Sequence, residues 1–225
     1  MPDQEFSKDT SSRTWKDWAQ GLLVLLAGLT IAHLGVTLFL LSEMGADTFT
    51  VLIQGISRRT GLSIGTCHVA MLVLLMAVML LTTKGYVKPG TVVCAFCGGW
   101  IIDFFLWVFG GFISTLSSPA LRVILMLAGC VILGFGMSII IKSNSGTGPN
   151  DLIAMIFSDK INQHRRIAFR WVRIGCDVFF VAVGFFLGGT VGIGTVVAAL
   201  LTGPVVQFFL PLSEKIIQKL FPRLG

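Results

Sequence analysis

The chain has 225 residues, of which 54% are apolar and 12% are charged, with a mean hydropathy of +0.86 and a formal net charge of +6. Soluble domains carry about 25% charged residues, so this composition indicates an integral membrane protein and excludes a soluble catalytic or DNA-binding domain. The basic residues lie near the ends of apolar segments, which is typical of membrane proteins and indicates no nucleic-acid partner. We expect the lipid bilayer to be the chain's first partner.

Residues 1–20 are polar, and we predict that they form a cytoplasmic N-terminal tail. The apolar stretch that follows has no small-residue cleavage site after it, so it predicts a retained helix rather than a signal peptide. Six apolar stretches are each long enough to cross a hydrocarbon core of about 30 Å as a helix. They cover residues 21–41, 62–83, 90–109, 121–141, 167–188 and 192–212.

Two short segments lie between the long ones. They are 47–57 (DTFTVLIQGIS) and 149–158 (PNDLIAMIFS), which are too short to cross at about 1.5 Å per residue. Asp47 is suited to the N-cap position of the first, and Pro149 to the first helical position of the second. We predict a short helix at each place, either re-entrant or lying at a membrane interface.

The last residues, 213–225, place Ile216, Ile217 and Leu220 on one helical face against Lys215 and Lys219. This pattern predicts an amphipathic cytoplasmic tail on the inner membrane surface.

The two parts of the chain repeat each other. Residues 90–106 and 194–210 share nine identities in seventeen positions at an offset of 104. At an offset of 101, several small residues match as well, which indicates a duplication of units 21–110 and 111–212. The matching pairs are Gly28 with Gly129, Gly35 with Gly136, Ser42 with Ser143, and Gly45 with Gly146.

Each unit contains three predicted spans, an odd number, so the second copy must lie upside down relative to the first. The predicted fold class is therefore an all-α polytopic membrane protein, with six transmembrane helices in a 3+3 inverted-topology repeat and one short helix per repeat. If the N-terminus lies inside, the lysines and arginines between the predicted spans fall mostly on the inner side. The outer side then receives only Arg58, Arg59 and Arg122, so the positive-inside rule predicts that both termini are cytoplasmic.

Five motifs in the same order resemble the YitT/YczE family of bacterial integral membrane proteins, most closely its YczE type. They are GISRRTGLSIGT, GGWIID, GTGPNDLI, WVRIGCD and GGTVGIGTVVAALLTGPVVQ. The resemblance covers nearly all of the chain after residue 20. It implies a multi-pass protein of the bacterial cytoplasmic (inner) membrane, and it implies almost nothing about activity.

The family pattern at the start of the short helix is often G-x-x-P-W-D. The second copy keeps Gly146, Pro149 and Asp151, with Asn150 in place of tryptophan, whereas the first copy has lost the proline and the acid. Relatives tend to carry an arginine followed four residues later by a glutamate in the fifth span, and here Arg173 and Asp177 have that spacing.

Ionisable side chains inside a membrane cost about 2.5–3.5 kcal/mol each, so they usually pair or line a cavity. Arg173 and Asp177 share one helical face with Arg170. The pair is either a self-neutralising ion pair or part of a substrate or proton pathway, and Arg170 lies near enough to the inner end to reach the headgroups. Asp103 has no basic partner within a turn, so it either reaches another span, where Arg173 is one candidate, or is protonated.

The start of the second short helix supplies four further candidates for substrate binding: Gly148, Pro149, Asn150 and Asp151. Free N–H groups at such a start can face an anion, although Asp47 and Asp151 would compete with the anion for them. The alternative is a pair of amphipathic helices at opposite interfaces.

The sequence contains no HExxH motif and no phosphate-binding loop, and we predict no enzymatic activity, no catalytic residue, no metal site and no cofactor. Cys94 and Cys97 form a CxxC that we interpret as core packing. His33 and His68 are interpreted as hydrogen-bonded structural residues rather than a proton relay.

We predict a small transporter or permease that moves a polar or anionic small molecule by alternating access. One alternative is a membrane scaffold or regulatory subunit, acting as a homo-oligomer or packed against another membrane protein. Another is the substrate-binding subunit of a multi-part importer, a role that gives no reason for an inverted duplication.

Overall fold

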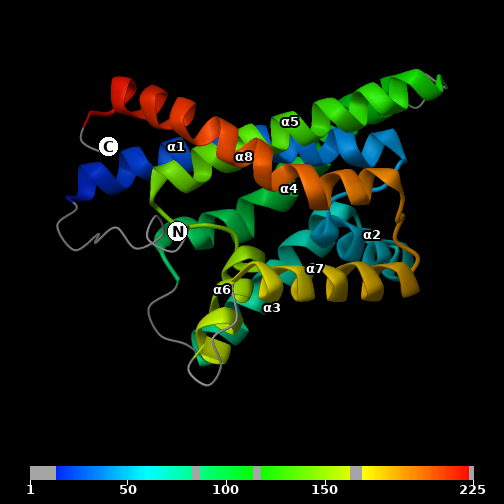
Figure 1. Ribbon diagram of the computed structural model, residues 1–225, viewed down its shortest axis with the longest axis horizontal. Coiled ribbons are helices and arrows are strands. Elements are labelled where there is room, and N and C mark those ends of the chain that lie inside the picture. The colour runs from blue at the N-terminus through cyan, green and yellow to red at the C-terminus, as the bar shows by residue number, and fades with distance from the viewer. Residues whose placement is uncertain (1–13, 83–86, 114–117, 163–168, 223–225) are drawn as a thin grey trace.

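A computed structural model describes residues 14–82, 87–113, 118–162 and 169–222 of the chain (Figure 1). All regular secondary structure in these ranges is α-helical, as predicted. The helices are α1 (Trp15–Ser42), α2 (Thr48–Thr60), α3 (Ile64–Thr82), α4 (Pro89–Ile113), α5 (Pro119–Ser143), α6 (Pro149–Asn162), α7 (Phe169–Phe186) and α8 (Ile193–Leu220).

Five helices, α1, α3, α4, α5 and α8, are long and apolar enough to cross a membrane. They carry many large apolar side chains on their outer surfaces, including Trp107 and Phe208, which suits contact with lipid. The helix for the remaining predicted span, α7, has 18 residues but contains Arg170, Arg173 and Asp177. The chain is therefore a multi-pass α-helical membrane protein in which one predicted span is distinguished by its charge.

The two short segments are α2 and α6, of 13 and 14 residues. Both run a few residues past their predicted ends because polar residues complete their last turns. In α2, Arg58 and Arg59 occupy the last turn, where cations favour the helix dipole, and Gly61 ends the helix with a φ of 73°. At about 1.5 Å per residue neither helix can span a hydrocarbon core of about 30 Å.

Two equivalent long helices, α1 and α5, pack closely along the centre of the molecule. A methyl group added to Gly35 would lie 2.7 Å from the Gly129 carbonyl oxygen, and one added to Gly28 would lie 3.0 Å from the Gly136 carbonyl oxygen. The absence of side chains at these positions lets the two backbones approach. The α1 and α5 helices are antiparallel, because Glu43 after α1 forms an ion pair with Arg122 near the start of α5 at 2.8 Å.

The turn between α1 and α2 and the turn between α5 and α6 are each hydrogen-bonded to the start of another helix. The Gly194 N–H at the start of α8 donates to the Met44 carbonyl at 2.8 Å, and the Gly90 N–H at the start of α4 donates to the Ser145 carbonyl at 2.9 Å. These two hydrogen bonds match at the offsets of the sequence repeat. The turn before α2 in the first half is therefore held by α8 of the second half, and the turn before α6 in the second half is held by α4 of the first half.

The predicted C-terminal tail does not begin as a separate element, because α8 continues unbroken from Ile193 to Leu220. Its last turns are held on α5 by two contacts. The Ser213 and Ser138 hydroxyls are hydrogen-bonded at 2.6 Å, and Lys142 Nζ forms an ion pair with Glu214 Oε2 at 3.1 Å. In Figure 1, α5 and α8 run side by side along one edge of the molecule.

Candidate functional site

A cavity of about 450 Å³ lies inside the helix assembly. Its wall includes the starts of both short helices, together with parts of α1, α5, α7 and α8. Most of the wall is apolar, and the polar side chains come mainly from α2, α6 and α7. This volume falls within the range of about 300–1,000 Å³ typical of small-molecule sites.

The start of α2 reaches the cavity through a sharp turn after α1. Glu43 ends α1 in the left-handed conformation, and Gly45 continues the turn with a φ of 108°. Asp47 then caps α2, its Oδ2 accepting from the Thr50 N–H at 3.2 Å. The next residue, Thr48, donates from Oγ1 to Asp177 Oδ1 of α7 at 2.7 Å. This polar turn is thus anchored to a charged residue of another helix.

The start of α6 is built in a similar way. Asn144 ends α5 in the left-handed conformation and Gly146 has a φ of 136°. Pro149 is fully buried at the first position of α6, while Gly148, Asn150 and Asp151 line the cavity. The Asn150 amide donates weakly to Asp151 Oδ1 at 3.4 Å.

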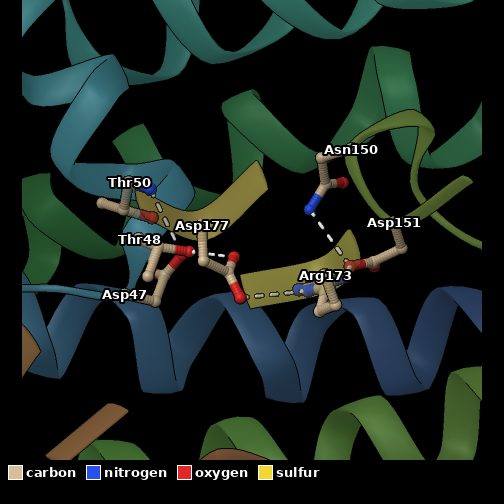
Figure 2. A network of polar contacts seen from close by, with 7 residues as sticks. All are labelled: Asp47, Thr48, Thr50, Asn150, Asp151, Arg173 and Asp177. Carbon is tan, nitrogen blue, oxygen red and sulfur yellow. Dashed lines mark hydrogen bonds and ion pairs between the residues drawn. The ribbon is translucent and has the colours of Figure 1, made fainter. Parts of the chain in front are cut away.

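Arg173 of α7 joins the two parts of the site. Its Nη1 donates to Asp151 Oδ1 at 2.7 Å and its Nε donates to Asp177 Oδ2 at 3.3 Å. Figure 2 shows Arg173 between the two carboxylates, with Thr48 on the far side of Asp177. The predicted pair of Arg173 and Asp177 is therefore not self-contained, because each partner also binds a short helix.

Asp103 lies elsewhere. Its Oδ1 accepts from the Gly65 N–H at 2.8 Å and its Oδ2 accepts from the Ser63 hydroxyl at 2.6 Å, so it caps the start of α3. It is not among the residues that line the cavity, and it does not pair with Arg173. The sequence prediction did not consider this role, because the donors are about forty residues away. The Arg170 side chain lies outside the described residues.

Several cavity residues were not among the sequence candidates. The sequence predicts Asp47 only as a helix cap and does not single out Thr48. His33 and His68 were predicted to be structural; both line the cavity, with their ring centroids 5.3 Å apart. His33 Nδ1 donates to the Leu29 carbonyl at 2.8 Å, which leaves Nε2 of a neutral ring as an acceptor. The sequence repeat aligns the α2 start with the α6 start, so the substrate-binding prediction made for α6 could have been extended to Asp47 and Thr48.

Four buried polar atoms in the cavity wall have no hydrogen-bond partner within the part of the chain that the structure describes: Asp47 Oδ1, His68 Nδ1, Thr147 Oγ1 and Thr202 Oγ1. The side chains of His68 and Thr147 are 6% and 5% exposed. Buried polar groups are nearly always hydrogen-bonded, so such a group in a cavity wall indicates a place that water or a ligand fills.

The fold and the site define a class: a multi-pass α-helical membrane protein with a cavity whose polar side chains gather at the starts of two short helices. The chain belongs to the family of unknown function DUF6198, whose pattern matches residues 19–211. The resemblance to the YczE type is confirmed by similarity to the uncharacterized membrane protein YczE of Bacillus subtilis, which is 25% identical over 90% of this chain and 88% of that protein.

Two further relatives are 30% identical to the chain. One is an uncharacterized protein of Haemophilus influenzae, matched over 90% of this chain and 88% of the relative. The other is the uncharacterized protein YyaS of Bacillus subtilis, matched over 84% of this chain and 91% of that protein. No solved structure matches the chain.

Proposed function

We propose that this protein is a small transporter that carries a polar solute across the membrane by alternating access. The observation that carries the proposal is the meeting of the α2 and α6 starts at one cavity, where Arg173 bridges Asp151 and Asp177. Short helices at corresponding places of two repeats are the usual position of a substrate site in secondary transporters. An interfacial role for α2 and α6 gives no reason for both starts to share a cavity.

The proposal includes a 3+3 inverted repeat with α7 as the sixth span. Support comes from the antiparallel packing of α1 and α5, which occupy equivalent places in the two halves. It also comes from the paired hydrogen bonds Met44 to Gly194 and Ser145 to Gly90, which an approximate two-fold axis would interchange. The charge on α7 favours a span that faces the cavity rather than lipid.

We further propose that the protein lies in the bacterial inner membrane with both termini in the cytoplasm. Support comes from the distribution of basic residues, which places Lys142 and Lys215 inside and Arg58 and Arg122 outside. The inverted repeat requires α1 and α5 to cross in opposite directions, and their antiparallel packing agrees with this arrangement.

The proposal is tested by solute-dependent stabilisation followed by flux. The purified protein is screened against small polar solutes for a rise in melting temperature, and each stabilising solute is assayed for entry into proteoliposomes. A ligand at one hundred times its Kd stabilises the folded state by about 2.7 kcal/mol, which such a screen detects.

The matched variants are Asp177→Asn, which alters the cavity, and Asp103→Asn, which alters the α3 cap. We expect stabilisation and flux in the wild type and in Asp103→Asn, and loss of both in Asp177→Asn. A protein that responds to no solute, supports no flux and co-purifies with one membrane partner would contradict the proposal and favour the scaffold role.

A further inference from the structure

The charges in the cavity wall are unbalanced. Its described residues include three carboxylates, from Asp47, Asp151 and Asp177, and one guanidinium, from Arg173. With all four groups ionised the formal charge is −2. A site with this balance attracts positive charge and repels anions.

The single guanidinium is not available to an anion. Arg173 already binds one carboxylate on α6 and another on its own helix, at 2.7 and 3.3 Å. An anion would have to displace Asp151 or Asp177 and leave that carboxylate unpaired inside the protein, which is costly.

The helix starts are also occupied by acids. Asp47 accepts from the Thr50 N–H at the start of α2, and Asp151 stands in the first turn of α6. These carboxylates already meet the positive ends of the two helix dipoles. At the predicted anion site, the chain's own carboxylates therefore already meet both helix dipoles, and the Thr50 N–H at the α2 start is already bonded.

Asp47 remains as the least compensated carboxylate of the wall. Its Oδ2 accepts from the Thr50 N–H, and its buried Oδ1 has no hydrogen-bond partner among the described residues. His68 Nδ1 and Thr147 Oγ1 are likewise buried and unpartnered in the same wall. A bound donor that carries positive charge would satisfy Asp47 Oδ1, because a charge-assisted hydrogen bond to a carboxylate is about twice as strong as a neutral one.

The rest of the wall suits an apolar, cationic body. Phe49 and Phe180 pack edge to face with centroids 5.5 Å apart, and Phe49 meets His68 at 5.5 Å. Aromatic rings attract cations by their quadrupole. Among the described residues there is also no group of three or more His, Cys, Asp or Glu side chains placed to hold a metal ion.

We infer that the cavity binds an organic cation, with an ammonium group at Asp47 and an apolar body against Phe49 and Phe180. The inference names the substrate class of the proposed transporter and rests on that function for its physiological meaning. It differs from the sequence prediction, which left anionic and other polar solutes open.

The test uses probes of similar size and different charge. The purified full-length protein is titrated with 2-phenylethylammonium and tetraethylammonium as cations, 3-phenylpropionate as the anion and 2-phenylethanol as the neutral form, and its melting temperature is followed. The variant Asp47→Asn keeps the α2 cap, because asparagine caps as well as aspartate, and removes the charge. Asp103→Asn is the control, since that carboxylate lies outside the cavity wall.

We expect at least one cation to raise the melting temperature saturably in the wild type and in Asp103→Asn, and to bind at least tenfold more weakly to Asp47→Asn. Stabilisation by 3-phenylpropionate alone, equal responses to all four probes, or no response to either cation would overturn the inference. The transporter proposal is tested by a separate measurement, flux in proteoliposomes. A cation that binds without flux in proteoliposomes would contradict transport and leave the inference standing, whereas flux of an anion would do the reverse.

Discussion

Arg173 of α7 binds Asp151 of α6 at 2.7 Å, which ties a charged long helix to the start of a short one. The same guanidinium binds Asp177 one turn along its own helix. Through Thr48, Asp177 is bound in turn to the start of α2. One arginine therefore links the polar starts of both short helices, and the loss of its charge should affect both.

Arg173→Gln is expected to lower stability, because it leaves two carboxylates without their cation. Hydrogen bonds to charged groups contribute about 1.5–3 kcal/mol each, and partial exposure places the loss near the lower end of that range. The melting temperature of the purified variant measures this effect. Adding Asp151→Asn to Arg173→Gln should recover part of the loss, and a double variant whose loss equals the sum of the two single losses would show that the two residues are not coupled.

Asp103→Ala should lower stability without changing the cavity. Asp103 accepts hydrogen bonds from Gly65 and Ser63 at the start of α3, and loss of a helix cap costs about 1 kcal/mol. The check compares its melting temperature and its probe affinities with those of the wild type. A tenfold loss of cation affinity in Asp103→Ala, at equal protein folding, would show that Asp103 acts in the site after all.

Gly35→Ala should be strongly destabilising, because the new methyl group would lie 2.7 Å from the Gly129 carbonyl oxygen and would force α1 and α5 apart. Gly175→Ala in α7 is the matched control, since no heavy atom lies within 4 Å of the added carbon. We expect the control to be neutral or to gain up to about 1 kcal/mol from helix propensity. Equal melting temperatures for the two variants would contradict the close packing of α1 and α5.

A reporter fused after Gly225 should behave as cytoplasmic, and one inserted after Gly61 should behave as external. The basis is the excess of lysine and arginine on the predicted inner segments. Alkaline phosphatase, which is active outside, and a fluorescent protein that folds inside make a complementary pair of reporters. An external C-terminus would contradict the proposed topology.

The local features of the fold were predictable from the sequence. Apolar length located the long helices, and the chemistry of Asp47 and Pro149 located the starts of α2 and α6 within a residue. The predicted helix boundaries were less accurate where a polar turn extends a helix beyond its apolar stretch. At Trp15–Gln20 a capping box between Thr14 and Asp17 begins α1 before the apolar stretch, so the predicted tail 1–20 is partly helical.

The candidate site was only half predictable, because its main contacts join distant parts of the chain. The spacing of Arg173 and Asp177 predicted their pairing on one helix face, and the structure has it. Nothing local indicates that Asp151 completes the pair or that Thr48 reaches Asp177 across 129 residues. Asp103 shows the opposite case, in which an acid inside an apolar stretch caps a neighbouring helix.

Alternating access at the cavity lined by the α2 and α6 starts can be tested by labelling a cavity thiol from each side of the membrane. Asn150→Cys places a thiol in the cavity wall, in a background where Cys67, Cys94, Cys97, Cys130 and Cys176 are replaced by alanine. Leu127→Cys, on an exposed apolar position of α5, is the control that should face lipid.

Labelling by a membrane-impermeant thiol reagent is measured in right-side-out and in inside-out vesicles. We expect Asn150→Cys to be labelled from both sides and Leu127→Cys from neither side. A cation that stabilises the protein should slow both reactions of Asn150→Cys. A thiol at residue 150 that reacts from one side only, at a rate that no stabilising solute changes, would contradict alternating access at this cavity.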